Sequence, residues 1–412
     1  MPSSLLSTLL LLLVGVALAR VSARHLARWA VPAIVLELVV GFVLGNSVLP
    51  YERLQPLTGL TELGVLTLFF QVGLEVQGGL LGARPLAVLR TVLLSALTPL
   101  LAWWPLQQAF HLSPAATVLV LAALSATGTG VTLRALSQAN ALHTPSGALL
   151  LGVSVLDDLP AIALLTLGLW QGSATVVPAG GRAIGPLLGL LVMAATLLVA
   201  RRWRGRFTAW TPTVLQVLLL LIACSWLGEC TGLTSLLGAL WGGVLLTRLA
   251  PRVADRTADH RLTQSLALLS DVFLPLYFMS VGMRVQASTL LQPAAWGMAA
   301  VLLLVAIGCK WLCALGVGRA DRAAGVDRWV VVFGLLPRGV PGLVVATSAL
   351  AAGVINSLQF SALVLMVSAT TVLGLLLLGR RLVAVGAAAD APTAWCGGVP
   401  ANPVDISPPR CG

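Results

Sequence analysis

The chain has 412 residues, of which 58% are hydrophobic and only 9% are charged, and its mean hydropathy is +0.97. A water-soluble domain carries about a quarter charged residues, so this composition excludes a globular domain with a fully solvated surface. The formal net charge of +11 does not indicate nucleic-acid binding, because the basic residues lie between apolar runs and form no single patch.

Apolar runs of bilayer-spanning length recur along nearly the whole chain. A membrane-crossing helix needs about 20 mostly apolar residues. Thirteen such spans are predicted, and they indicate an all-α polytopic membrane protein. In chain order they cover residues 4–20, 31–49, 60–77, 86–109, 115–137, 145–170, 183–200, 212–229, 232–248, 263–283, 290–316, 329–352 and 358–379.

The arginines between these spans alternate sharply from one side to the other. One set of loops and span ends carries nineteen: Arg20, Arg24, Arg28, Arg84, Arg90, Arg134, Arg201, Arg202, Arg204, Arg206, Arg248, Arg252, Arg256, Arg261, Arg319, Arg322, Arg328, Arg380 and Arg381. The opposite set carries only Arg53, Arg182 and Arg284. Cytoplasmic loops are the ones rich in basic residues. The pattern therefore predicts that the N-terminus lies outside and the C-terminus lies in the cytoplasm.

The end of the chain differs in composition from the spans. From about Leu382 it is rich in Ala, Pro, Gly and Cys, and a short disordered cytoplasmic tail over 382–412 is expected. The six cysteines of the chain have neither metal-site nor disulfide-framework spacing, so no resident metal or redox cofactor is expected.

A few charged residues lie inside the spans or at their ends. A charge at the bilayer centre costs roughly 2.5–3.5 kcal/mol on insertion scales, so such residues usually serve ion or proton pathways. Structural pairing is favoured for Glu37, Glu62 and Glu75, and an interfacial position for Glu229 and Asp271. The other charged residues of this kind are Asp157, Asp158, Lys310 and Arg338.

The adjacent acids Asp157 and Asp158 are the strongest candidates for a binding site. Neighbouring residues on a helix point about 100° apart, so one carboxylate can pair with a distant partner while the other faces a cavity. Lys310, the only lysine among 25 basic residues, is the candidate partner. Such acids titrate as a coupled pair and can exchange a proton for a cation. The simpler alternatives are a helix-end acid pair and a lysine that snorkels to the cytoplasmic surface.

Two spans contain residues that interrupt a regular helix. "LSATGTGVTLRAL" (Leu124 to Leu136) has two glycines and four hydroxyl residues at mid-membrane depth, although a close helix contact made by small residues is an alternative. "LLPRGVPGLVVATSAL" (Leu335 to Leu350) has two prolines around Arg338, which we expect to stabilise either broken backbone or a carboxylate.

The two interruptions fall at corresponding places. If residues 4–170 and 212–379 are two six-span repeats joined by a linker helix at 183–200, each interruption lies in the fifth span of its repeat. The interruptions are separated by seven spans, an odd number, which makes the repeats antiparallel. Inverted repeats with broken helices are typical of secondary transporters.

These residues also form a pattern that resembles a known family. Over about residues 5 to 380 the chain is similar to the bacterial Na⁺/H⁺ exchanger family of monovalent cation:proton antiporters. The similarity lies in the order and spacing of six stretches: "ELVVGFVLG" (Glu37 to Gly45), "FFQVGLEV" (Phe69 to Val76), "SATGTGVTLRAL" (Ser125 to Leu136), "VLDDLPAI" (Val155 to Ile162), "FLPLYFMSVGM" (Phe273 to Met283) and "LLPRGVPGLVV" (Leu335 to Val345).

The resemblance implies an antiporter-like fold over 1–381, in a homodimer within the bacterial inner membrane. It implies a core domain (86–170 and 290–379), a dimerisation panel (4–77 and 212–283) and two broken helices that cross near the ion site. Surrounding lipids would be its other contacts. No enzymatic activity or cofactor is implied, only the transported ions H⁺ and Na⁺, Li⁺ or K⁺.

The resemblance also assigns roles within the ion site. Asp158 would be the principal cation and proton carrier, and Asp157 would form a salt bridge with Lys310. Such double-acid members are typically electrogenic. We expect Asp158, Asp157 and Thr127 to supply oxygen ligands to the cation. The remaining broken-helix residues of the expected site are Ser125, Gly128, Thr129, Gly130, Arg338 and Gly339.

One departure from the family pattern concerns Arg338. Many relatives carry a glutamate directly after the Arg-Gly pair, whereas this chain has Val340 followed by Pro341. Arg338 therefore lacks its usual acidic neighbour, which changes the local charge balance.

Other classes of membrane protein remain as alternatives. A sodium-coupled organic solute symporter of the same architecture needs a larger cavity and no acid pair with a lysine. An intramembrane aspartyl protease needs two acids that face one water, whereas adjacent acids point apart. A pore or sensor would show no coupled proton flux.

Overall fold

All regular structure in the described part of the chain is helical. The computed structural model describes residues 5–25, 32–75, 84–128, 131–132, 135–136, 139, 141, 144–172, 179–203, 212–231, 233–249 and 260–390. Within these residues, eight helical segments are long and apolar enough to cross a bilayer, and five shorter apolar helices lie between them. These thirteen segments fall on the thirteen predicted spans, which confirms the all-α polytopic fold.

The bounds of the elements show where single spans are built from several pieces. In chain order they are α1 (Leu5–His25), α2 (Ala33–Ser47), η2 (Tyr51–Leu57), α3 (Thr58–Glu75), α4 (Pro85–Leu97), η3 (Thr98–Ala102), α5 (Trp103–Phe110), α6 (Pro114–Ser125), α8 (Pro145–Gly172), α9 (Ala179–Trp203), α10 (Val214–Cys230), α11 (Ser235–Leu249), α12 (His260–Arg284), α13 (Ala287–Leu290), α14 (Pro293–Leu312), η5 (Cys313–Gly316), α15 (Arg319–Ala323), α16 (Arg328–Leu335), α17 (Gly339–Ala351) and α18 (Ser357–Asp390).

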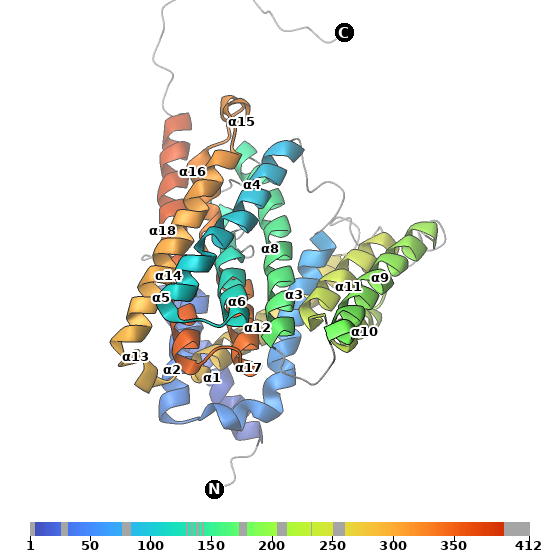
Figure 1. Cartoon of the computed structure of the whole chain (residues 1–412), viewed down its shortest axis with the longest axis vertical. Coiled ribbons are helices and arrows are strands. Elements are labelled where there is room, and N and C mark those ends of the chain that lie inside the picture. The colour runs from blue at the N-terminus through green and yellow to red at the C-terminus, as the bar shows by residue number, and fades with distance from the viewer. Residues whose placement is uncertain are drawn as a thin grey trace, which may run out of the picture.

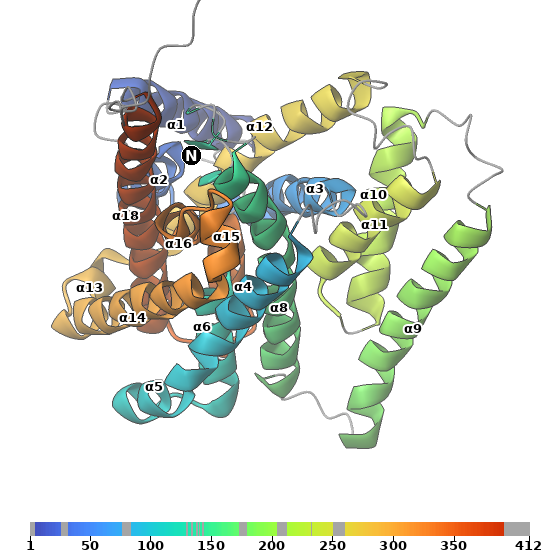
Figure 2. The ribbon, with the colours of Figure 1, turned by 90° about the horizontal axis from the view of Figure 1, so that it is seen from above.

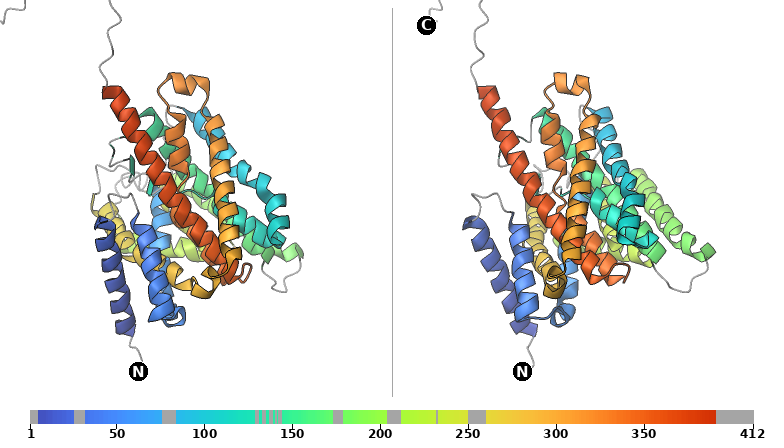
Figure 3. Two further views of the ribbon diagram at one scale, coloured as in Figure 1. Left: turned by 90° about the vertical axis from the view of Figure 1, so that its left-hand side faces the viewer. Right: turned by 60° about the vertical axis from the view of Figure 1, so that its left-hand side comes forward.

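The helices form two bundles, which lie next to each other in Figures 1 and 2. In the crossing bundle, defined as α4–α8 with α14–α18, α6 packs on α8 and α17, and α18 packs on α14, α16 and α17. Figure 3 shows α18 running obliquely across this bundle. In the flanking bundle, defined as α1–α3 with α10–α12, α2 packs on α12 and α3 packs on α11 and α12. The linker helix α9 packs against α11, at the edge of the molecule in Figure 2.

Two interrupted helices meet in the middle of the crossing bundle. The first half-helix, α6, ends at Ser125, and α16 and α17 are separated by a break that contains Pro337. The backbone N–H of Gly128 donates to the carbonyl oxygen of Pro337 at 2.6 Å, so the two breaks touch through their main chains. The prediction of two crossed broken helices is thereby confirmed.

Gly339 allows this close approach for two reasons. Its φ is +46°, a left-handed conformation that side-chain-bearing residues rarely adopt. A Cβ atom on Gly339 would also lie only 2.9 Å from the Cα atom of Gly128. The glycine therefore satisfies a backbone and a packing constraint at once.

The boundary predicted for the tail is too early. Helix α18 continues to Asp390, so residues 382–390 are helical, and the alanines from Ala387 to Ala389 favour helix continuation. The rest of the predicted tail, 391–412, lies outside the described residues.

The apolar interior joins the two bundles at one end of the molecule. One buried cluster combines Leu240, Tyr277 and Val281 of the flanking bundle with Leu343 and Val344 of α17. The other clusters found among the described residues each stay within a single bundle. The joining cluster lies toward α13, opposite to the end that carries α15 (Figure 1).

A buried hydrogen bond also connects the two bundles. The hydroxyl of Tyr277 on α12 lies 3.0 Å from the hydroxyl of Thr347 on α17. The two bundles are therefore held together at the α13 end by both apolar packing and a polar contact.

We expect Gly339→Ala to lower the free energy of unfolding by roughly 2–4 kcal/mol, because it adds left-handed backbone strain and an overlap with Gly128. Thermal unfolding of the purified protein in detergent measures this. The control is Gly297→Ala on α14, where an added Cβ meets nothing within 4 Å. Equal melting temperatures for both variants would contradict the tight crossing.

Candidate functional site

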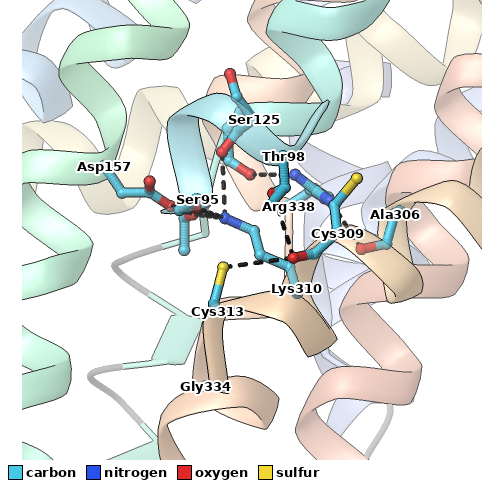
Figure 4. Close-up of polar contacts among 12 residues, drawn as sticks. Ser95, Thr98, Ser125, Asp157, Ala306, Cys309, Lys310, Cys313, Gly334 and Arg338 are labelled. Carbon is cyan, nitrogen blue, oxygen red and sulfur yellow. Dashed lines mark hydrogen bonds and ion pairs between the residues drawn. The ribbon is translucent and has the colours of Figure 1, made fainter. Parts of the chain in front are cut away.

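The crossing point brings together polar residues from four parts of the chain. Lys310 on α14 reaches Asp157 on α8, next to Ser95 on α4 (Figure 4). Thr127, just after α6, lies beside them. None of these four side chains is more than 1% exposed. An acidic and a basic group are thus held together in the apolar interior.

The ion pair is surrounded by further hydrogen bonds. Lys310 Nζ lies 2.7 Å from Asp157 Oδ2, and it also donates to Thr127 Oγ1 at 3.1 Å, to the Ser125 carbonyl at 3.3 Å and to Ser95 Oγ. Asp157 Oδ2 in turn accepts from Ser95 Oγ at 2.7 Å and from Thr127 Oγ1. A buried ion pair is tolerated only where such bonds satisfy its remaining donors and acceptors. Its two members are the pair that the family resemblance implies.

The second carboxylate oxygen of Asp157 is in a different situation. Oδ1 is buried and has no hydrogen-bond partner among the residues that the structure describes. A buried polar atom of this kind calls for a functional explanation. It supplies an oxygen that a cation or a proton can use.

Arg338 donates hydrogen bonds to two backbone carbonyls, one at the first break and one on α14. Its side chain is fully buried, and it donates from Nη1 to the Ala126 carbonyl at 3.0 Å and from Nη2 to the Ala306 carbonyl at 3.3 Å. Ala126 follows the last residue of α6, where the helix dipole is negative and the final carbonyls have no partner in the helix. Of the two roles expected from the sequence, stabilisation of broken backbone is the one these bonds show. Val340 packs in the apolar cluster beside it.

Asp158 is also buried, with 1% exposure. It follows Asp157 on the regular helix α8, so its side chain leaves the helix about 100° away from that of Asp157. The two carboxylates therefore face different surroundings, as the sequence predicts.

The structure brings together some of the expected broken-helix residues but not all of them at one point. Ser125 contributes its carbonyl to Lys310, while its hydroxyl bonds to the Ala122 carbonyl of its own helix. Gly128 and Gly339 form the crossing itself. Thr129 and Gly130 lie outside the described residues.

Two simpler interpretations of the charges are wrong. Lys310 is 1% exposed and ion-paired, so it does not snorkel to the surface. Asp157 and Asp158 lie inside α8, which runs from Pro145 to Gly172, so they are not a helix-end pair.

The acids expected outside the site differ in how deeply they are buried. Glu37 is buried, whereas Glu62, Glu229 and Asp271 are exposed. The side chain of Glu75 is outside the described part of the structure.

Sequence reasoning missed the contribution of α4 and the adjoining η3. Ser95 and Thr98 stand three residues apart in the apolar stretch "LLSALTPLL", a spacing that puts both hydroxyls on one helix face. That spacing was a usable signal. Thr98 donates to the carbonyl of Cys309, next to Lys310, at 3.3 Å.

The transmembrane profile of the sodium/hydrogen exchanger family matches residues 9–380, nearly the whole chain. The chain belongs to the sodium/hydrogen exchanger family. Its buried acid and lysine thus lie within the part that defines this family of transporters.

Three curated relatives illustrate the family's range. A Na⁺/H⁺ antiporter of Enterococcus hirae is 25% identical, with coverage of 85% of this chain and 92% of the relative. The high-affinity Na⁺/H⁺ antiporter NhaS3 of Synechocystis sp. is 27% identical, with coverage of 87% and 81%. The Na⁺/H⁺-K⁺ antiporter GerN of Bacillus cereus is 23% identical, with coverage of 84% and 89%.

A solved structure has the same fold. The sodium proton antiporter MjNhaP1 from Methanocaldococcus jannaschii superposes with a TM-score of 0.63 at 17% identity, covering 90% of this chain and 97% of that one. At this level of identity the similarity concerns the fold alone.

We expect Lys310→Met to lower the free energy of unfolding by about 3–5 kcal/mol, because it leaves the buried Asp157 without its partner. Adding Asp157→Asn to this variant removes the unpaired charge and restores part of the loss. Thermal unfolding of the parent and the two variants measures both effects.

The exposed ion pair between Arg381 and Asp327 is the matched control. It is equally short, at 2.7 Å, but the arginine side chain is 41% exposed. Arg381→Met is expected to cost less than about 1 kcal/mol. A similar loss of unfolding free energy at both sites would mean that the buried pair contributes no more to stability than the exposed one.

Proposed function

We propose that the protein exchanges Na⁺ or Li⁺, or K⁺, for protons across the bacterial inner membrane as a secondary active transporter. The observation that carries this is the buried Lys310–Asp157 pair, located beside Asp158 at the crossing of two broken helices. The names of the relatives support it, since they are antiporters for Na⁺ and H⁺ and, in one case, K⁺. They do not favour an organic solute symporter.

The binding step follows from the chemistry of the site. Alkali cations are hard and prefer oxygen ligands. Asp158 would be the principal carrier of either the cation or a proton. Asp157 and Thr127 would supply further oxygens once Lys310 moves away from them. The return of Lys310 to Asp157, together with protonation of Asp158, would displace the cation.

The buried charges support an electrogenic cycle. With both acids ionised, Asp157 and Asp158 balance Lys310 and Arg338. A bound cation takes the place of the proton on Asp158 and deprives Lys310 of its counter-ion. Because the interior disfavours an unpaired charge, Lys310 would also release its proton. Two protons would then move for each cation.

Alternating access would use the two bundles. In this proposal the crossing bundle is the moving core, the flanking bundle is the panel, and a homodimer forms through the panel within the surrounding lipid. With the N-terminus outside, the α13 end, where one apolar cluster joins the two bundles, faces outward.

Proton flux in proteoliposomes with an imposed pH gradient tests the proposed exchange. We expect Na⁺, Li⁺ or K⁺ to dissipate the gradient with the parent protein, and Asp158→Asn to reduce this flux at least a hundredfold, because it removes the titrating carrier. Asp271→Asn, the same change at an exposed acid, is expected to retain the parent flux. If no cation moves protons, or if Asp158→Asn matches the parent, the exchange mechanism fails.

Unequal exchange gives a separate electrical prediction. When two protons move for one cation, turnover is expected to generate a membrane potential, and clamping the potential with valinomycin and K⁺ is expected to speed Na⁺-driven flux several-fold. A voltage-sensitive dye reads the potential directly. Absence of any signal during measurable exchange would show a one-for-one stoichiometry.

A further inference from the structure

Helix α4 and the adjoining η3 contact the lysine-bearing helix through one buried hydroxyl each, Ser95 on α4 and Thr98 at the start of η3. Ser95 Oγ donates to Asp157 Oδ2 at 2.7 Å and accepts from Lys310 Nζ. One turn further on, Thr98 Oγ1 donates to the carbonyl of Cys309 at 3.3 Å. One hydroxyl therefore contacts the charged end of Lys310, and the other fixes the backbone beside it (Figure 4).

The arrangement of Ser95 is not what a buried hydroxyl in a helix usually shows. Such hydroxyls commonly bond to a carbonyl in the preceding turn, as Thr91 does on the same helix, to the Ala87 carbonyl at 2.8 Å. Ser95 instead contacts side chains from two other helices. Both of those side chains are charged and buried.

A hydroxyl suits this position because it can donate and accept at the same time. Its single proton goes to the carboxylate, and a lone pair faces the ammonium group. Bonds to charged partners are about twice as strong as bonds between neutral groups. The serine thus strengthens the ion pair from both sides.

We propose that Ser95 is a positioning residue that sets how tightly Lys310 holds Asp157, and so how well the lysine competes with the transported cation. This rests on the proposed function. When Lys310 withdraws, the Ser95 hydroxyl keeps its bond to Asp157 and holds the carboxylate in place. Ser95 need not touch the cation.

The test measures exchange in proteoliposomes at fixed pH, with Na⁺ and Li⁺ in turn as the probe. Ser95→Ala removes both bonds to charged partners, but only the bond from Lys310 differs between the paired and the withdrawn lysine. Loss of that one bond corresponds to about a tenfold change in the pairing equilibrium. We expect the apparent KM for the cation to fall about tenfold and the maximal rate to fall as well, because Lys310 displaces the cation less well. Ser95→Thr, which keeps a hydroxyl, is expected to restore both values.

The matched control is Thr91→Val, which removes a buried hydroxyl from the same helix without touching the ion pair. It is expected to leave KM as in the parent. A KM that rises in Ser95→Ala would make Ser95 a cation ligand and overturn the positioning role. An unchanged KM in an exchanging, folded Ser95→Ala variant would overturn it too.

A second measurement does not depend on transport. Thermal unfolding of the parent, Ser95→Ala, Lys310→Met and the double variant forms a cycle that isolates the coupling between the two residues. We expect Ser95→Ala to lower the melting temperature markedly in the parent background and much less in the Lys310→Met background. Equal effects in both backgrounds would overturn the positioning role of Ser95, whatever the flux measurements show. If the two residues are coupled but no cation drives proton flux, the proposed exchange is refuted and the coupling of Ser95 to Lys310 stands.

Discussion

Removal of two opposite charges from water is the constraint around which this structure is organised. The Lys310–Asp157 pair has almost no access to solvent, and its desolvation is unfavourable by several kcal/mol per ion. The pair persists because hydroxyls from α4 and the first break, together with a freed carbonyl, accept hydrogen bonds from Lys310, and the same hydroxyls donate to Asp157 Oδ2. The broken helix is thus part of the same solution, because a continuous helix would have kept that carbonyl for itself.

The same logic explains the two half-helices. Each break releases backbone groups that cannot remain unsatisfied in a membrane. Gly128 and Pro337 satisfy two of these groups on each other, and Arg338 satisfies the end of α6. Unpaired main-chain groups would destabilise an ordinary transmembrane span, but here they form hydrogen bonds within the site.

Much of this was accessible from the sequence, for reasons that can be stated. Span number followed from apolar run length, and the breaks followed from glycines and prolines at equivalent positions. Asp157, Asp158 and Lys310 stood out because charge is rare in these spans. Ser95 did not stand out, since a lone serine in an apolar helix is common and its partners lie 62 and 215 positions away in the chain. The extension of α18 to Asp390 is not apparent from the sequence, because the composition changes at about Leu382, before the helix ends.

Arg338 has an implication for regulation. Its hydrogen-bond partners are carbonyls, which do not change charge at any pH, and the residue after Gly339 is the apolar Val340. The guanidinium is therefore a constant electrostatic background against which the other buried groups change state. Any response of the transporter to acidity must therefore come from groups other than Arg338.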